Sequence, residues 1–409
     1  GIKNGESFNP QWIEGFKDEK NIQFKNQNYD QIRIDYYGYM PEINRQNNIM
    51  KLNGPFKKIE PLKLQIIGSL YNPNKTQIFY SPKSSYNIYN KHSFGISFYN
   101  QLLPKNGFSY KISPMYSFGN KNFSGEANFA FKKYSQNTFY QSIKIGIDNK
   151  HNLYDYNRKY YRIQPYVDIQ LKKKNHRSKI DNKVFLSYIH ILKDTYFLWE
   201  EGNASFLSAS YTYSNKRRLN PYSVKTNYEK SKNHNKIELS INFKKDINQK
   251  KKVNIRSYIG FVNTKNNIYN LKMSAWNGAD DYTFNENTIS REKNSNHEIP
   301  YNRQIIIKEG GLKHTTDETF NSDKFLSSTY IDYNITNLFQ LYAEIGTNGA
   351  NIAYGSGFKV PIGINGPGFF TGIQFYLPVL TENGITPLKD FKNTLRFNMQ
   401  FEFRGFGLF

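Results

Sequence analysis

The side chains best suited to metal or acid–base chemistry are the seven histidines, because imidazole binds metals and exchanges protons near neutral pH. His297 and Glu298 begin the zinc motif H-E-x-x-H, but Tyr301 stands where the second histidine is required. We therefore interpret this pair as part of a solvated loop. The other histidines form no ligand pair at helical spacing; they are His92, His151, His176, His190, His234 and His314.

Carboxylates come close together in the sequence at two places. Asp280–Asp281 with Glu286 offer the oxygen ligands that calcium prefers, but their spacing is not that of an EF-hand loop. Glu200–Glu201, beside Trp199, form a pair of the type used in acid–base catalysis. We interpret the first group as a solvated acidic patch and Trp199 as an aromatic residue at a membrane interface.

The segment Tyr354–Phe358, YGSGF, is a cluster of small residues that we interpret as a turn or as the crowded wall of a barrel. The sequence holds neither a phosphate-binding Walker loop nor a G-x-S-x-G nucleophile elbow. It also lacks cysteine, and with it any thiolate nucleophile, thiolate metal site or disulfide. No catalytic, cofactor-binding or metal-ligating residue is therefore predicted in this segment, and no cofactor.

The net charge of +23 indicates an anionic partner, such as nucleic acid, lipopolysaccharide phosphate or an anionic solute, or else compositional drift toward Lys, Asn, Ile and Tyr. Basic residues mixed with aromatics are typical of nucleic-acid binding. The two best patches are Lys172–Arg177 and Lys244–Lys252. Because both fall between predicted strands, loops explain them, and no nucleic-acid partner is predicted.

The elements that carry these residues are predicted to be strands. From Leu62 onward, apolar residues recur at every second position over segments of about 9–13 residues, long enough for a tilted strand to cross a membrane. Strands of soluble sandwiches are usually nearer 5–6 residues. Aromatic residues make up 17% of the chain, as the aromatic girdles of a membrane barrel would require. The clearest segments are Phe94–Phe98, Phe108–Ile112, Phe123–Phe131, Tyr161–Leu171, Leu207–Tyr213, Ile237–Phe243, Val253–Phe261 and Phe339–Ile345.

The last segment, Phe391 to Phe409, alternates most regularly. Phe397, Met399 and Phe401 lie on one face of the predicted strand, and Arg396, with Arg404 further on, lies on the other. In a barrel the first face meets lipid and the second lines the lumen. The terminal Phe409 further favours a barrel.

Polar gaps separate the segments. Asp148–Lys159, Lys172–Lys183, Asn215–Asn235 and Asn277–Tyr301 are predicted to be long loops, with short turns such as Asn334–Asn337 between other strands. The predicted fold is all-β: an antiparallel transmembrane β-barrel of about 14–16 strands, preceded by a small β-rich domain. Residues 1–60 are assigned to the end of a β-sandwich-like linker domain, and residues 61–409 to the barrel. Pro55 and Pro61 mark the boundary.

No basic start followed by an apolar core, as in a signal peptide, is visible in residues 1–30, and Gly1 is not an initiator methionine. We expect a mature or excised segment, with an upstream portion missing.

The stretch from Trp12 to Asn48 resembles the region just downstream of the catalytic domain in M1-family (gluzincin) metallopeptidase-like proteins of Bacteroidetes. The likeness lies in WIEGF at Trp12–Phe16, DQIRID at Asp30–Asp35 and MPEINR at Met40–Arg45. The resemblance implies a zinc peptidase domain upstream, with zinc bound there. The zinc histidines, the catalytic glutamate and the G-x-M-E-N element are missing here, so this segment should not hydrolyse peptides.

These expectations place the chain in the outer membrane of a Gram-negative bacterium, with its N-terminal part in the periplasm. The expected partners are outer-membrane lipid and lipopolysaccharide, and the barrel-assembly machinery through the C-terminal strand ending at Phe409. The expected role is that of a membrane anchor or pore for a metallopeptidase-like protein. The alternatives are a porin-like or transporter-like channel with a basic lumen, a soluble β-sandwich binding protein, and part of an active peptidase once the upstream half is restored.

Overall fold

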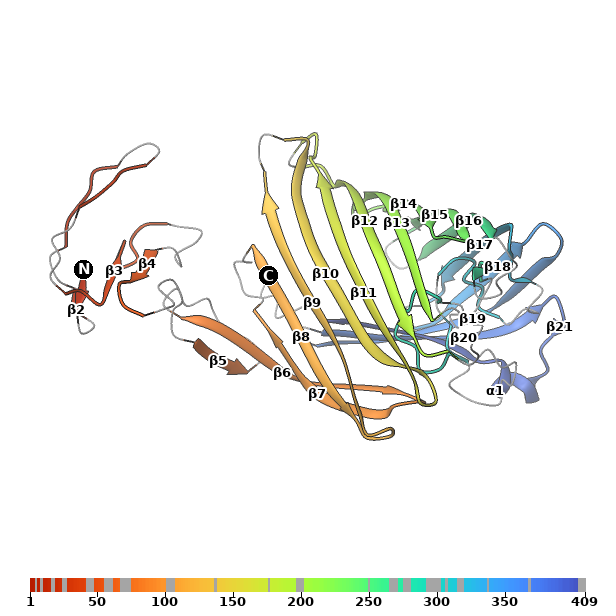
Figure 1. The fold of residues 1–409 in the computed structure, drawn as a ribbon. Coiled ribbons are helices and arrows are strands. Elements are labelled where there is room, and N and C mark those ends of the chain that lie inside the picture. Colours follow the sequence, from red (N-terminus) through yellow and green to blue (C-terminus); the bar gives the residue numbers. More distant parts are fainter. Residues whose placement is uncertain are drawn as a thin grey trace. The chain divides into compact units, whose positions relative to one another are not determined.

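The alternating segments of the sequence fold into long antiparallel strands in a computed structural model (Figure 1). It describes residues 1–409 except 4–5, 8–9, 16–18, 24–27, 42–47, 55–61, 67–74, 101–106, 136–137, 176, 196–201, 249–250, 265–270, 275–280, 292–302, 306–307, 315–319, 337, 367–368 and 404–409. The chain divides into two units, residues 1–81 with 98–106 and residues 82–97 with 107–409. The boundary near residue 60 stays a prediction.

The first unit contains a small sheet with strand order β2-β1-β3-β4. Ile2 of β1 pairs with Gln31 of β3, and Ile32 of β3 pairs with Met50 of β4. Ile2 and Tyr29 are the buried apolar residues beside these short strands. The strands are β1 Ile2–Lys3, β2 Glu6–Ser7, β3 Gln31–Arg33 and β4 Ile49–Lys51.

The large sheet is a β-barrel that is antiparallel except where the short β5 pairs in parallel with β6, so the predicted fold class is confirmed. Its strand order is that of a closed barrel, and β8 to β13 lie side by side as long tilted strands in Figure 1. Setting aside the short β5 Leu62–Ile66 and β21 Gly384–Ile385, the described part of the barrel has 16 strands, within the predicted range. They are β6 Thr76–Asn87, β7 Lys91–Tyr99, β8 Phe108–Ser117, β9 Asn122–Tyr134, β10 Tyr140–Asp155, β11 Arg158–Leu171, β12 Ile180–Lys193, β13 Asn203–Asn215, β14 Tyr222–Lys230, β15 His234–Asp246, β16 Lys252–Thr264, β17 Phe325–Asn334, β18 Gln340–Thr347, β19 Ile352–Gly366, β20 Phe369–Thr381 and β22 Arg396–Phe403.

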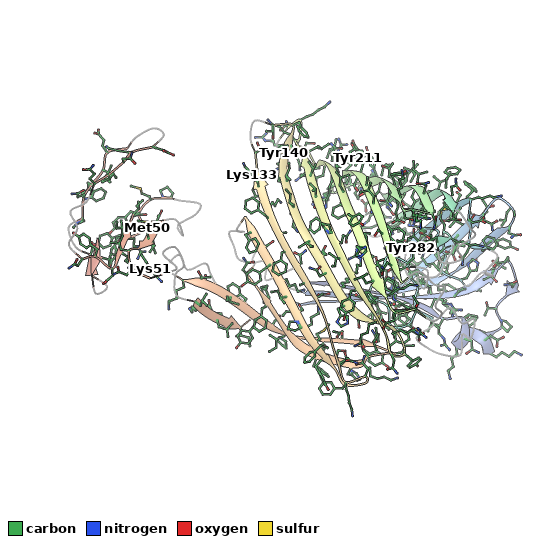
Figure 2. The ribbon with its side chains drawn as sticks, in the orientation of Figure 1. Met50, Lys51, Lys133, Tyr140, Tyr211 and Tyr282 are labelled. Carbon is green, nitrogen blue, oxygen red and sulfur yellow. The ribbon has the colours of Figure 1, made fainter. Side chains whose placement is uncertain are left out.

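The strand register sorts the connections onto two ends of the barrel. One end carries the connections 172–179, 216–221 and 247–251, and β22 also finishes there; we call it the terminal end. The opposite end carries the tight turn at 156–157 and the 60-residue connection 265–324; we call it the long-loop end. Tyr140 and Tyr211 mark the terminal end in Figure 2.

The outward face of the barrel is apolar, whereas its inward face carries buried polar and charged side chains beside buried apolar clusters that include residues of the β16–β17 connection. In β18 the side chains of Gln340, Tyr342 and Glu344 are buried, while those between them are exposed. Leu341 is 40% exposed and Ile345 is 53% exposed, whereas Glu344 is 4% exposed. This distribution is the reverse of that in a soluble sandwich, whose apolar faces are buried between sheets.

The last strand begins later than predicted. Residues Phe391–Thr394 form the helical turn α1, after the 3-10 turn η7 at Leu388–Asp390, and β22 begins at Arg396 rather than at Phe391. Within β22 the predicted alternation is confirmed: Arg396 and Asn398 are buried inside, and Met399 is exposed outside. Arg404 and Phe409 lie outside the described residues.

Two of the predicted long loops are wrong. Asp148–Lys159 belongs almost wholly to β10 and β11, which meet at the turn around Asn157, a residue with the positive φ of +57° that tight hairpin turns favour. Asn215–Asn235 contains β14. The physical reason is the same in both places: inward-facing side chains of a barrel are polar, so these strands look like loops when judged by polarity.

Candidate functional site: the lumen and its inserted segment

The described residues of the connection between β16 and β17 lie in the lumen, and we call this connection, residues 265–324, the inserted segment. Its described parts are 271–274, 281–291, 303–305, 308–314 and 320–324. Met273 and Ser322 form an antiparallel bridge that joins the two arms, with N–H to O distances of 2.8 and 3.0 Å. Ile305 donates its backbone N–H to Phe397 O of β22 at 2.8 Å, so the segment reaches the wall strands directly.

Three inward-facing glycines leave the space that the segment occupies. A Cβ on Gly260 would lie 2.7 Å from Met273 Sδ, one on Gly346 would lie 3.3 Å from Leu312, and one on Gly355 would lie 2.8 Å from His314 Nδ1. A side chain at 260 or 355 would force atoms of the segment to move, and one at 346 would press on Leu312. The barrel wall and the inserted segment therefore pack closely at these three glycines.

A buried ion pair fixes the middle of the segment. Lys236 Nζ of β15 donates to Glu309 Oε1 at 2.7 Å, and both side chains are almost fully buried. The other carboxylate oxygen of Glu309 accepts the backbone N–H of Ser274 at 2.5 Å. Glu309 has a φ of +49°, a conformation in which non-glycine residues are strained unless neighbours hold them. Burial raises the pKa of Glu309, and Lys236 opposes that rise.

The turn after Glu309 is held through its backbone. Arg256 of β16 donates to Glu309 O at 2.5 Å and to Gly310 O at 3.0 Å. Ser328 Oγ of β17 also donates to Gly310 O, at 2.6 Å. Two neighbouring strands thus satisfy carbonyl groups that would otherwise be buried without partners.

The tip of the segment is fastened by His314. Its Nδ1 lies 2.7 Å from Glu344 Oε1 of β18, and its Nε2 lies 2.8 Å from Glu382 Oε2 in the turn after β20. The same Glu344 carboxylate accepts the backbone N–H of Lys313 at 2.8 and 2.9 Å. Burial alone would lower the pKa of His314, but the hydrogen bonds that it donates to two carboxylates outweigh burial and raise its pKa to about 9. The imidazole is therefore charged at neutral pH.

The start of the segment contacts the opposite wall. Asn285 Oδ1 accepts from Arg162 of β11 at 3.1 Å, and Asn285 O accepts from Lys150 of β10 at 2.6 Å. Tyr282 Oη donates to Glu229 of β14 at 2.5 Å. The segment therefore contacts the wall from β10 to β22 and crosses the lumen.

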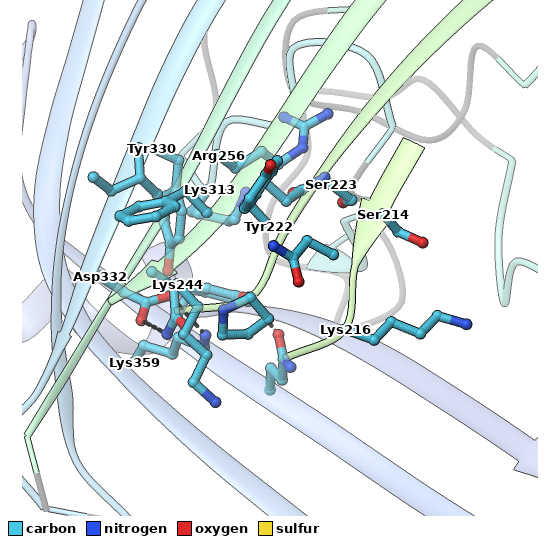
Figure 3. Close-up of a pocket in the computed structure, with 18 residues that line it drawn as sticks. Ser214, Lys216, Tyr222, Ser223, Lys244, Arg256, Lys313, Tyr330, Asp332 and Lys359 are labelled. Atoms are coloured by element: carbon cyan, nitrogen blue, oxygen red, sulfur yellow. Dashed lines mark hydrogen bonds and ion pairs between the residues drawn. The ribbon is translucent and has the colours of Figure 1, made fainter. Parts of the chain in front are cut away.

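A cavity of about 470 Å³ remains at the terminal end of the lumen, next to Lys313 (Figure 3). Cationic side chains dominate it: Lys216, Lys244, Arg256, Lys313 and Lys359 line it, and Asp332 is the carboxylate among the lining residues. Lys359 Nζ pairs with Asp332 at 3.1 Å, drawn as a dashed line in Figure 3. This arrangement attracts anions.

The described histidines and carboxylates that were candidates for metal or acid–base chemistry do not form such a site in the structure. Asp281 is neutralised by Lys308 at 3.2 Å and Arg291 at 3.5 Å, so it is a buried ion-pair partner rather than a solvated acidic residue. Among the described residues, no group of three His, Cys, Asp or Glu is placed to hold a metal ion. The absence of metal and cofactor from this segment stays a prediction. His176, Glu200–Glu201, Asp280 and His297–Glu298 lie outside the described residues.

The glycine-rich segment Tyr354–Phe358 lies inside β19, where the wall is crowded by His314 and by the neighbouring strand β20. The crowded-wall interpretation is confirmed, and the turn interpretation is wrong. The patch Lys172–Arg177 falls in the β11–β12 connection, as predicted, with Lys173 paired to Asp181 at 2.7 Å.

The sequence does not predict the inserted segment, because Asn277–Tyr301 is interpreted there as a long polar loop. The sequence holds one indication: Gly260, inside the predicted strand Val253–Phe261, and Gly355, in the segment interpreted as a turn or a crowded wall, are small residues. Small residues there imply a close approach by another part of the chain.

No protein-family model and no curated protein matches the chain. Among solved structures the chain is similar to BamA from Haemophilus ducreyi lacking POTRA domains 1–3. That match has 9% sequence identity and a TM-score of 0.44, and it covers 80% of this chain and 69% of that chain. The resemblance of residues 12–48 to metallopeptidase-like proteins stays a prediction. Within the described residues, no helix has the length and apolar character needed to span a membrane.

Proposed function

We propose that this protein is an outer-membrane β-barrel that serves as a membrane anchor rather than as an open channel. The observation that carries the proposal is the inverted side-chain distribution, with apolar residues outside and polar residues inside. A contiguous exposed apolar surface of this extent is costly in water and is stable against lipid.

The spacing of aromatic residues on β8 and β9 supports membrane embedding. At the long-loop end, exposed Phe123 packs against Tyr116 with ring centroids 5.5 Å apart. Phe131, on the same outward face of β9, is also exposed, and Phe139 is exposed at the terminal end. The eight residue steps from Phe123 to Phe131 span about 26 Å along the strand, or about 20 Å across a barrel tilted by about 40°, which fits within the apolar band of outer-membrane barrels, about 25 Å tall.

The inserted segment supports an anchor over a pore. It crosses the lumen and is held by the Lys236–Glu309 ion pair and by the contacts of His314. A channel with a basic lumen is the second candidate, favoured by the cation-lined cavity at the terminal end. A soluble β-sandwich would leave residues such as Ile345 and Leu341 exposed to water, which disfavours it.

The kind of protein that the barrel would anchor is inferred from the resemblance of residues 12–48 to metallopeptidase-like proteins. The barrel would hold a metallopeptidase-like protein at the outer membrane of a Gram-negative bacterium, with the N-terminal unit in the periplasm. Zinc would be bound only by an upstream catalytic domain. Lipid and lipopolysaccharide would surround the barrel, and the assembly machinery would recognise its C-terminal strand. The full-length reading frame tests this part: the absence of H-E-x-x-H upstream would remove the peptidase.

Two measurements on the folded protein test the anchor. Heat-modifiable mobility in detergent is expected, because a folded barrel migrates differently from its unfolded chain; a protein that is monodisperse without detergent would contradict membrane embedding. Planar-bilayer recordings are expected to show no steady conductance. Steady current through the wild-type barrel would favour the channel instead.

A further inference from the structure

The cavity at the terminal end contains more positive charge than the one carboxylate among its described lining residues can balance, even though Lys216 pairs with Asp181 outside the cavity at 2.8 Å. Asp332 is shared between Lys359 at 3.1 Å and the Asn254 amide at 2.5 Å. Arg256 is engaged by two backbone carbonyl groups, which carry no net charge. Positive charge therefore remains at the cavity wall, where burial makes each uncompensated charge costly.

Lys313 is the most deeply buried of these cations, because it is only 1% exposed. Its Nζ donates to Gly311 O and lies 4.5 Å from the centre of the Tyr330 ring and 5.7 Å from that of Tyr376. Among the described residues, no carboxylate lies within 4.0 Å of this ammonium group. The nearby Glu344 carboxylate is already bound to backbone N–H groups and to His314.

A second polar group at the cavity is left unsatisfied. The hydroxyl of Tyr330 is buried and has no hydrogen-bond partner among the described residues, and the whole residue is only 7% exposed. A buried hydroxyl without a partner costs about 1–3 kcal/mol. Tyr330 and Lys313 line the same cavity (Figure 3), so one bound anion can satisfy both a hydroxyl donor and an ammonium group.

We propose that this cavity binds a phosphate-bearing anion, with Lys313 and Lys359 as its cationic contacts and Tyr330 as a hydroxyl donor. Lysine and arginine are the usual protein contacts of phosphate oxygens. The volume of about 470 Å³ exceeds that needed for one simple ion and falls in the range of small-molecule sites. The aromatic rings beside Lys313 leave an apolar surface for the rest of such a molecule. This binding site goes beyond the anchor function.

The electrostatics of Lys313 agree with the geometry. Burial lowers the pKa of its ammonium group to about 7; Glu344 opposes that fall, and Arg256 and Lys359 add to it. A bound anion would restore the charged form.

The test uses the full chain, folded in detergent without divalent cations, with inorganic pyrophosphate as the probe in isothermal titration calorimetry. Saturable binding is expected for the wild type. Lys313→Met and Lys359→Met are each expected to weaken it about tenfold or more, the effect of losing a hydrogen bond to a charged group. Lys183→Met is the matched control, because Lys183 pairs with Asp168 at 2.8 Å and does not line the cavity.

The source of the phosphate is distinguished by competition. If vesicles containing lipid A displace pyrophosphate, the natural ligand is a lipid headgroup; if only soluble phosphates compete, it is a solute. The proposal is overturned if the wild type shows no saturable binding, or if Lys183→Met weakens binding as much as Lys313→Met. Heat-modifiable mobility of every variant shows that the barrel is folded, so failed binding leaves the anchor proposal standing.

Discussion

His314 fastens the inserted segment to the wall, and the free energy of this contact depends on pH. Its pKa is raised to about 9 by Glu344 and Glu382, against an ordinary value of 6.5. The docked segment therefore binds the proton more tightly than the released segment. The contribution is fully present below pH 6.5 and is lost as pH rises through about 9. A difference of about 2.5 pH units corresponds to on the order of 3 kcal/mol.

The neighbouring Lys313 acts in the opposite direction. Its pKa in the docked segment is about 7, below its ordinary value, so its unfavourable burial is relieved as pH rises from about 7 to 10.5. The pH profile of the wild type alone would mix the two effects. Comparing the wild type with His314→Gln at each pH isolates the histidine. The substitution is expected to cost on the order of 3 kcal/mol near pH 6 and little near pH 10.

The assay is cleavage of the inserted segment by a protease active over this pH range, normalised to cleavage of the unfolded chain. When opening is fast relative to cleavage, the cleavage rate reports the population of the released segment. About 3 kcal/mol corresponds to a change of roughly 100-fold or more in that population. If the ratio of the cleavage rates of variant and wild type were the same at pH 6 and at pH 10, charged His314 would not stabilise the docked segment.

Three further changes test the fit of the segment. Gly355→Val places a side chain against His314 and should speed segment cleavage about tenfold or more, while Gly15→Val, at an open position, should not. Glu309→Gln should destabilise the docked segment by about 3 kcal/mol, because it leaves Lys236 buried with only a 3.5 Å carboxylate contact; Lys236→Met with Glu309→Leu should be nearly neutral in the same cleavage assay. Replacing residues 271–322 by a short linker should produce steady conductance in planar bilayers, and a variant that stays closed would show that the segment is not the barrier.

The barrel could be predicted from the sequence because its outward face repeats one simple pattern. Ile237, Leu239 and Ile241 alternate regularly, and all lie in β15 as predicted. Where the inward face is strongly polar, as around Asn149 and Asn227, the same strands were taken for loops. Polarity marks exposure to water in a soluble protein, but in a barrel it also marks the lumen.

The site could not be predicted in the same way. Glu309 contacts Lys236, which lies 73 positions away in the sequence, and His314 contacts Glu344, which lies 30 positions away. In each pair one residue lies on the irregular segment and the other on a strand. Periodicity places residues on faces of regular elements, but it does not place a segment that lacks regular structure. The cation-lined cavity depends in part on this packing, because Lys313 belongs to the segment, whereas the other four lining cations belong to the barrel strands and their connections.

The central claim is that the outer surface of the barrel faces lipid. It is tested by arginine substitutions at two depths on the outward face, Ile147→Arg and Phe123→Arg, measured by denaturant unfolding from lipid vesicles. Ile147 pairs with Phe129, midway along the apolar band, and Phe123 lies at its long-loop edge and is exposed. Arginine should cost about 2–4 kcal/mol at Ile147 and about 0–1 kcal/mol at Phe123. Equal and small costs at both positions would contradict membrane embedding.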